Sequence, residues 1–241
     1  MDWNNDGFQD LVVGDGPGYV HLYLNNGTGN VPELDAGSNI EAGGVPINVG
    51  GRAAPVVDDW NGDGKKDLLI GNFYGNITVY LNEGTDAGPL FNSSFNLKFS
   101  NGQEMKIGTR AAPRIFDWDR DSLKDLLIGE FEGNIYLLKN KGTNSSPVFD
   151  SSEKLLLTTG EPLLYSGKGR GHRVRLTVTD WNNDGLQDIL TGGTDGRVMI
   201  FAGSPEPLFM GIIDRFWLTG TGEKIKRRLR RLRGLDEEDR R

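Results

Sequence analysis

Four short acidic segments carry a repeated pattern of oxygen side chains. They read DWNNDGFQD at residues 2–10, DWNGDGKKD at 59–67, DWDRDSLKD at 117–125 and DWNNDGLQD at 180–188. Asp or Asn stands at the first, third, fifth and ninth positions of each segment. Calcium takes roughly six to eight oxygen ligands, and a tight loop with this spacing turns alternate side chains inward, as in the first half of an EF-hand loop. The pattern therefore predicts four loops that bind Ca2+.

The predicted ligands are the side-chain oxygens of those four positions and the backbone carbonyl of the seventh. By loop they are Asp2, Asn4, Asp6, Phe8 and Asp10; Asp59, Asn61, Asp63, Lys65 and Asp67; Asp117, Asp119, Asp121, Leu123 and Asp125; and Asp180, Asn182, Asp184, Leu186 and Asp188. No loop has the bidentate Glu that completes an EF-hand, and strands rather than helices are expected on both sides. Acidic β-turns that owe Asp and Asn to turn chemistry are the alternative, and four copies in register favour calcium.

The third loop departs from the other three at two positions. Ser122 replaces the glycine of the sixth position, where a left-handed backbone costs a residue with a side chain about 1 kcal/mol. Asp119 replaces Asn at the third position and adds a negative charge. We therefore expect a cation site here whose strength differs from that of the other loops.

The acidic loops belong to a longer repeat, because the first Asp of each loop recurs at nearly even intervals along the chain. Two glycines follow that Asp at fixed distances in all four copies, while an Asn after it and an Arg before it keep their distances in three copies. In that order they are Gly14, Gly71, Gly129 and Gly192; Gly18, Gly75, Gly133 and Gly196; Asn25, Asn82 and Asn140; and Arg52, Arg110 and Arg173. Each period contains about four strand-like segments separated by Gly and Asn, which is typical of one β-propeller blade.

We therefore predict an all-β fold of β-propeller blades, each with four antiparallel strands. Residues 1–221 should form four repeats, at about 1–49, 50–107, 108–170 and 171–221, followed by a charged helical or disordered tail at 222–241. The first repeat begins at its acidic loop and has no strand equivalent to residues 52–60. An incomplete ring or open arc is therefore expected, with residues 209–218 as the outer strand of the fourth blade. Open edges also predict self-association.

The acidic loop, the Gly-x-x-x-Gly hairpin and the strand ending in Asn-x-Gly-Thr together resemble the FG-GAP repeat. This repeat is shared by the propellers of integrin α chains and by the related VCBS repeats of bacterial secreted proteins. The resemblance covers residues 1–205. It implies a calcium loop between the first two strands of each blade, a ring of about seven blades, and an extracellular or cell-surface location.

Composition excludes several classes of function. The chain has no Cys, so disulfides and zinc–thiolate sites are excluded, and its two His leave little room for a Ser-His-Asp triad. The net charge is −7, and because residues 222–241 contribute +4, the rest of the chain carries −11. An acidic body argues against nucleic acid as a partner. Because no segment is long and apolar enough and the first residues lack a basic and apolar leader pattern, neither a transmembrane segment nor a signal peptide is expected in this sequence.

Aromatic and basic residues offer further candidates. Trp3, Trp60, Trp118 and Trp181 share the second loop position, and we expect them to pack between blades rather than to stack on sugars. The recurring arginines are expected to form internal salt bridges rather than to capture a ligand. Between the recurring glycines, Phe73, Tyr74 and Phe131 are candidate ligand contacts.

Two basic segments carry weaker signals. Residues 166–171, SGKGRG, lack the spacing of a phosphate-binding loop and are expected to form a turn between blades. Residues 224–233 place Ile and Leu at helical spacing. They would bind an anionic surface or membrane, or form a solvated helix.

The predicted function is a calcium-binding, noncatalytic module that binds a glycan or a protein outside the cell. One alternative is part of a polysaccharide lyase with a propeller fold. It would need a cluster around an unshared basic residue, and the sequence suggests none. A structural spacer in a large surface protein is the other alternative. The chain is therefore expected not to be an enzyme.

Overall fold

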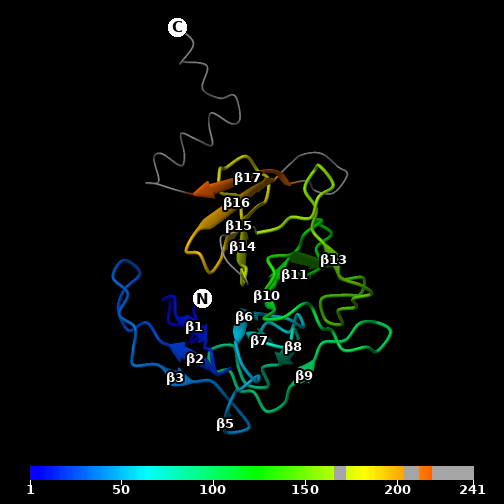
Figure 1. Cartoon of the computed structure of the whole chain (residues 1–241). Coiled ribbons are helices and arrows are strands. Elements are labelled where there is room, and N and C mark those ends of the chain that lie inside the picture. Colours follow the sequence, from blue (N-terminus) through cyan, green and yellow to red (C-terminus); the bar gives the residue numbers. More distant parts are fainter. Residues whose placement is uncertain (166–171, 204–211, 219–241) are drawn as a thin grey trace.

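The computed structural model describes residues 1–165, 172–203 and 212–218, and every regular element in these ranges is a β-strand (Figure 1). The predicted turn at 166–171 and the predicted tail at 222–241 lie outside the described residues. Within the described residues, no helix is long and apolar enough to span a membrane.

In the described part of the chain, the strands form three four-stranded antiparallel sheets, one three-stranded sheet and one small two-stranded sheet. The three-stranded sheet contains β1 (Leu11–Gly14), β2 (Val20–Tyr23) and β3 (Ser38–Asn39), and the small sheet contains β4 (Glu41–Ala42) and β5 (Val45–Pro46). The four-stranded sheets follow in sequence order: β6 (Ala54–Asp58), β7 (Asp67–Gly71), β8 (Ile77–Tyr80) and β9 (Phe95–Asn96); β10 (Ala112–Phe116), β11 (Asp125–Gly129), β12 (Ile135–Leu138) and β13 (Glu153–Lys154); β14 (Arg175–Thr179), β15 (Asp188–Gly192), β16 (Val198–Gly203) and β17 (Ile212–Leu218). The prediction of an all-β fold built from four-stranded antiparallel units is confirmed.

The sheets lie side by side around a centre and form an open arc (Figure 1). Strands β6, β10 and β14 lie nearest the centre, and β9, β13 and β17 lie at the outside. β10 packs beside both β6 and β14, and β6 packs beside β1. Among the described strands, β1 pairs only with β2, and β17 pairs only with β16. The predictions of an open arc and of an outer fourth strand within residues 209–218 are therefore confirmed.

The apolar cores lie between successive sheets. Trp3 packs with Leu68 and Phe91 of the second sheet unit, and Trp60 packs in the same way with residues of the third. The Trp60 and Phe149 rings are stacked, with centroids 6.2 Å apart. Trp3, Trp60 and Trp118 are all buried, which confirms core packing for these three residues.

The recurring glycines allow neighbouring sheets to approach closely. A Cβ atom on Gly71 would collide with the carbonyl oxygen of Ala111, and one on Gly129 would lie 2.7 Å from the carbonyl oxygen of Val174. Gly192, the equivalent in the last sheet, has no such close neighbour. Trp181 of the same repeat is 41% exposed, so it departs from the buried position predicted for it. Both exceptions fall on the last sheet of the arc, which has no described sheet beyond it.

Substitution of the tryptophans should distinguish the buried site of Trp60 between two sheets from the partly exposed site of Trp181 on the last sheet. Trp60→Ala removes a buried ring between two sheets and should lower the free energy of unfolding by about 3–5 kcal/mol. The matched variant Trp181→Ala removes a ring that is already partly in water, so the loss should be at most about 1.5 kcal/mol. Urea denaturation of the two variants measures the difference, and equal losses would contradict the assignment of the cores to the spaces between sheets.

Candidate metal centre

Each acidic loop is shaped by the carboxylate of its first Asp. In the first loop, Asp2 accepts hydrogen bonds from the backbone N–H groups of Asp6 at 3.1 Å and Gly7 at 2.8 Å. The same pair of bonds recurs at the first Asp of the second, third and fourth loops. The fifth-position Asp then accepts the N–H of the seventh residue in every loop. Asp and Asn favour such turns because their short side chains bond to the backbone nearby.

The sixth position of the loop is left-handed in all four copies. Gly7, Gly64 and Gly185 have φ values of 92°, 85° and 83°, and Ser122 has a φ of 71°. The expectation that Ser122 takes the conformation of the missing glycine is confirmed. At its sixth position, the third loop therefore carries backbone strain that glycine avoids in the other loops.

The ninth-position Asp fastens the loop to the sheet. The buried carboxylate of Asp67 accepts the Trp60 N–H at 2.9 Å and the Asn82 N–H at 2.7 Å. Asp10, Asp125 and Asp188 accept the corresponding two bonds, from the Trp of the same loop and from the residue that aligns with Asn82. One carboxylate thus connects the start of the loop to the residue that follows the second strand after that loop.

The recurring Asn residues hold in place the segment that leads to the outermost strand of a blade, such as the segment between β8 and β9. Sequence analysis missed this role. Asn82 is buried, and its side-chain oxygen accepts the N–H groups of Gly84 at 2.8 Å and Leu90 at 3.0 Å. Asn25 and Asn140 make equivalent bonds. The fourth repeat has Gly203 at this position. The signal was present in the sequence as an Asn that recurs at a fixed distance after the last Asp of the loop.

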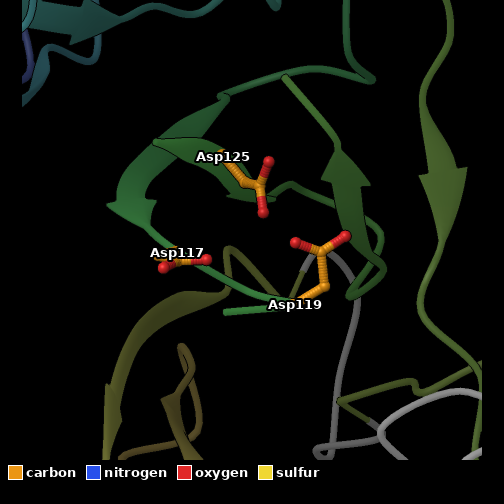
Figure 2. A group of neighbouring side chains, drawn as sticks. All are labelled: Asp117, Asp119 and Asp125. Atoms are coloured by element: carbon orange, nitrogen blue, oxygen red, sulfur yellow. The ribbon is translucent and has the colours of Figure 1, made fainter. Parts of the chain in front are cut away.

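Carboxylate oxygens converge in the third loop. One oxygen from each of Asp117, Asp119 and Asp125 lies within 4.8 Å of the other two, and Figure 2 shows the three side chains around a common space. Asp119 Oδ2 accepts a hydrogen bond from Lys139 Nζ at 2.9 Å. Asp119 Oδ1 is buried and has no hydrogen-bond partner in the structure. A buried anionic oxygen without a donor is costly, and a hard cation would compensate it. The donor set therefore fits calcium.

Burial and neighbouring charge both act on the ninth-position carboxyls. Desolvation by burial raises the pKa of Asp67 and of Asp125 above the usual value. The N–H donors described above lower the pKa of each group, and the charges of Asp119 and Asp121 raise that of Asp125 further. An ionised carboxylate in this setting is disfavoured, and a divalent cation among these groups would reverse the effect.

The other three loops carry Asn in place of Asp119, and their amides bond within the loop. Asn4 and Asn61 each accept the N–H of the fifth residue and donate to its carboxylate. Asn182 donates to Asp188 at 2.8 Å. These bonds place the first, third and fifth positions on one turn of each loop. Among the described residues, only Asp117, Asp119 and Asp125 bring three carboxylates within 4.8 Å of one another, and Asp121 is not part of that group. That the predicted side-chain ligands of the loops bind a metal, and that the carbonyls of Phe8, Lys65, Leu123 and Leu186 join them, stay predictions.

Basic side chains connect neighbouring loops, which the sequence did not indicate. Lys66 Nζ donates to the Asn5 side chain of the preceding loop at 2.6 Å. Lys124 forms an ion pair with Asp58, just before the second loop, at 2.7 Å and also bonds to the carbonyl of Asp59, the first residue of that loop. Arg120 donates to the carbonyl of Gly185 in the fourth loop at 3.0 Å. The four loops therefore form one connected row.

The predicted internal salt bridges of the recurring arginines are wrong. Among the described residues, Arg52, Arg110 and Arg173 form no ion pair. Arg110 instead lies against aromatic rings, with its guanidinium carbon 4.4 Å from the centroid of Phe131 and 5.4 Å from that of Phe73.

The fold and the loops together define a repeated β-sheet protein with an acidic loop in every repeat, and comparison with known proteins agrees. Residues 2–57 match the model of the FG-GAP-like repeat family, and Integrin alpha-4 of Xenopus laevis is 29% identical over 174 residues. That match covers 66% of this chain and 16% of the relative's length. The FG-GAP resemblance is confirmed.

A solved structure of the Photorhabdus luminescens Tc holotoxin pore is also similar, with 18% identity and a TM-score of 0.39. The match covers 86% of this chain and 8% of that chain.

Removal of Lys139 should strengthen cation binding in the third loop. Repeats one and two carry Leu24 and Leu81 at this position, so Lys139→Leu is compatible with the blade. It frees Asp119 Oδ2 and removes a positive charge, which should lower the calcium dissociation constant by about fivefold to tenfold. Calorimetric titration measures it, with the third-loop step assigned by its loss in Asp117→Asn.

Lys141→Leu is the matched control. Lys141 pairs with Asp150 at 3.1 Å, outside the acidic loop, so this variant should leave calcium binding unchanged. Weaker or unaltered binding in Lys139→Leu would contradict the assignment of Asp119 as a ligand.

Proposed function

We propose that this chain is a noncatalytic, calcium-stabilised module that binds a glycan or a protein at the cell surface or outside the cell. The observation that carries the proposal is the convergence of Asp117, Asp119 and Asp125, with one oxygen of Asp119 buried and unpartnered. The same loop conformation recurs in the other three repeats, so the proposal extends to four cation sites.

Calcium has a structural task in this scheme. When bound, it neutralises carboxylates that would otherwise repel one another in a small loop. The residues of this chain then fix the distance between the first and second strands of a blade, because the loop joins them. A rigid row of blades can present variable segments to a partner.

The similarity to an integrin α chain supports the location and the binding role. The hairpin between β7 and β8 supplies a candidate contact surface, because Tyr74 is 60% exposed and Phe73 is 38% exposed. Exposed aromatic rings on a rigid hairpin are suited to contacts with a partner.

Calcium should raise the melting temperature of the chain. At a calcium concentration about tenfold above the dissociation constant, each site adds about 1.4 kcal/mol to the free energy of unfolding. Sites of extracellular type bind at roughly 10⁻⁴–10⁻³ M, so about 5 mM calcium tests the proposal against excess chelator. The gain should shrink in Asp117→Asn but not in the control Asp150→Asn, which alters an exposed carboxylate outside the loops. A melting temperature that calcium does not change would disprove the proposal.

We also propose that two copies of the chain associate through the exposed face that carries Trp181. Three of the four equivalent tryptophans are covered by a following sheet, and a second copy would cover the fourth. Sedimentation should show a concentration-dependent dimer that Trp181→Glu weakens. A monomer at all concentrations for the unaltered chain would disprove this association.

A further inference from the structure

Five arginines gather on the inner side of the arc. Arg52, Arg110 and Arg173 stand in the recurring turns just before β6, β10 and β14, while Arg114 lies on β10 and Arg175 begins β14. These three strands lie nearest the centre of the arc (Figure 1). We refer to these five residues as the arginine cluster.

The backbone fixes three members of the arginine cluster. The N–H groups of Arg52, Arg110 and Arg173 donate to the carbonyls of Gly16, Phe73 and Phe131 in the preceding blade, at 2.9, 2.9 and 3.1 Å. All three residues have positive φ, at 55°, 56° and 48°. The same strained turn therefore places an arginine at the same point of three successive blades.

The charge of the cluster has no counter-ion among the described residues. None of the five side chains forms an ion pair there, and Arg110 Nη1 and Arg173 Nε are buried without a hydrogen-bond partner. Among the described residues, the Nη1 atoms of Arg114 and Arg175 donate to the carbonyl of the residue just before them and to no carboxylate. Guanidinium groups whose N–H donors have no carboxylate partner favour an anionic acceptor.

The arginines are also close enough to repel one another. Desolvation lowers the pKa of Arg175, and the positive charges of Arg114, Arg173, Arg110 and Arg52 lower it further. Desolvation likewise lowers the pKa of Arg110, followed by the charges of Arg173 and Arg52. Like charges gathered without a partner are unfavourable, and such an arrangement often marks a binding site.

Aromatic surface lies beside this charge. The Arg110 guanidinium lies against the rings of Phe73 and Phe131, and Tyr74 meets Phe73 edge-on with centroids 5.3 Å apart. A sugar ring that bears an anionic group matches both features, since its apolar face packs on an exposed aromatic ring while the anion pairs with guanidinium. An acidic peptide offers the charge without the flat ring.

We propose that the arginine cluster binds the sulfate or carboxylate groups of an acidic saccharide chain. The proposal deepens the proposed function by naming the ligand class, and it rests on that function for the binding role. The acidic remainder of the chain repels polyanions, so binding should be confined to the cluster.

The test uses the full chain in calcium, with a chondroitin sulfate oligosaccharide as the probe and neutral dextran as the comparison. The unaltered chain should bind the first and not the second. Arg114→Gln/Arg175→Gln removes two charges outside the strained turns and should weaken binding by about tenfold or more. Lys98→Gln/Lys154→Gln removes two exposed charges outside the cluster and should leave binding unchanged.

Competition experiments and variants of the basic segment 224–233 show which ligand feature and which charged residues account for binding. Inorganic sulfate should compete only at far higher concentration than the saccharide, and equal competition by sulfate or by a poly-glutamate peptide would overturn the saccharide assignment. The Lys and Arg residues of 224–233 are a rival polyanion site. Loss of binding when they are changed to Gln, with no loss in the cluster variant, would overturn the proposal.

The melting temperature of each variant, with and without calcium, checks folding separately. A calcium-stabilised chain that does not bind chondroitin sulfate would disprove the arginine site and leave the calcium proposal standing. Saccharide binding by a chain that calcium does not stabilise would support the arginine site and disprove the calcium proposal.

Discussion

The buried carboxylate at the ninth loop position is the interaction on which the rest of each blade depends. In every repeat it accepts one N–H from the start of the acidic loop and one from the end of a distant strand. Such charge-assisted bonds are strong when desolvated. The same burial makes the ionised carboxylate costly, so the group that holds the blade together also favours a cation nearby.

The spaces between blades depend on this geometry. Each blade presents a Trp from its loop to the next blade, and glycines at fixed distances from the loop let the next inner strand approach. The last sheet is the exception, because no described sheet lies beyond it: Trp181 is exposed and Gly192 has no close neighbour. Sequence repetition thus becomes structural repetition because every unit is completed by the unit beside it.

Local features were predictable from the sequence, and contacts between repeats were not. Loop spacing and hydrophobic alternation act within a few residues, so the strands and the left-handed Ser122 were predicted correctly. The hydrogen bond of Lys66 to the preceding loop and the ion pair of Lys124 with Asp58 depend on how neighbouring repeats stack. The arginines were mispredicted for the same reason, since the contact of Arg110 with the Phe73 ring of the preceding hairpin is also a contact between repeats.

Calcium binding by the acidic loops is tested most directly by a crystal structure of the chain grown in calcium, with anomalous scattering used to locate the ions. If the loops bind calcium, each should show an anomalous peak about 2.3–2.6 Å from the carboxylate oxygens. In the third loop, that peak should lie among Asp117, Asp119 and Asp125. Loops of the same conformation without a peak, at saturating calcium, would contradict it.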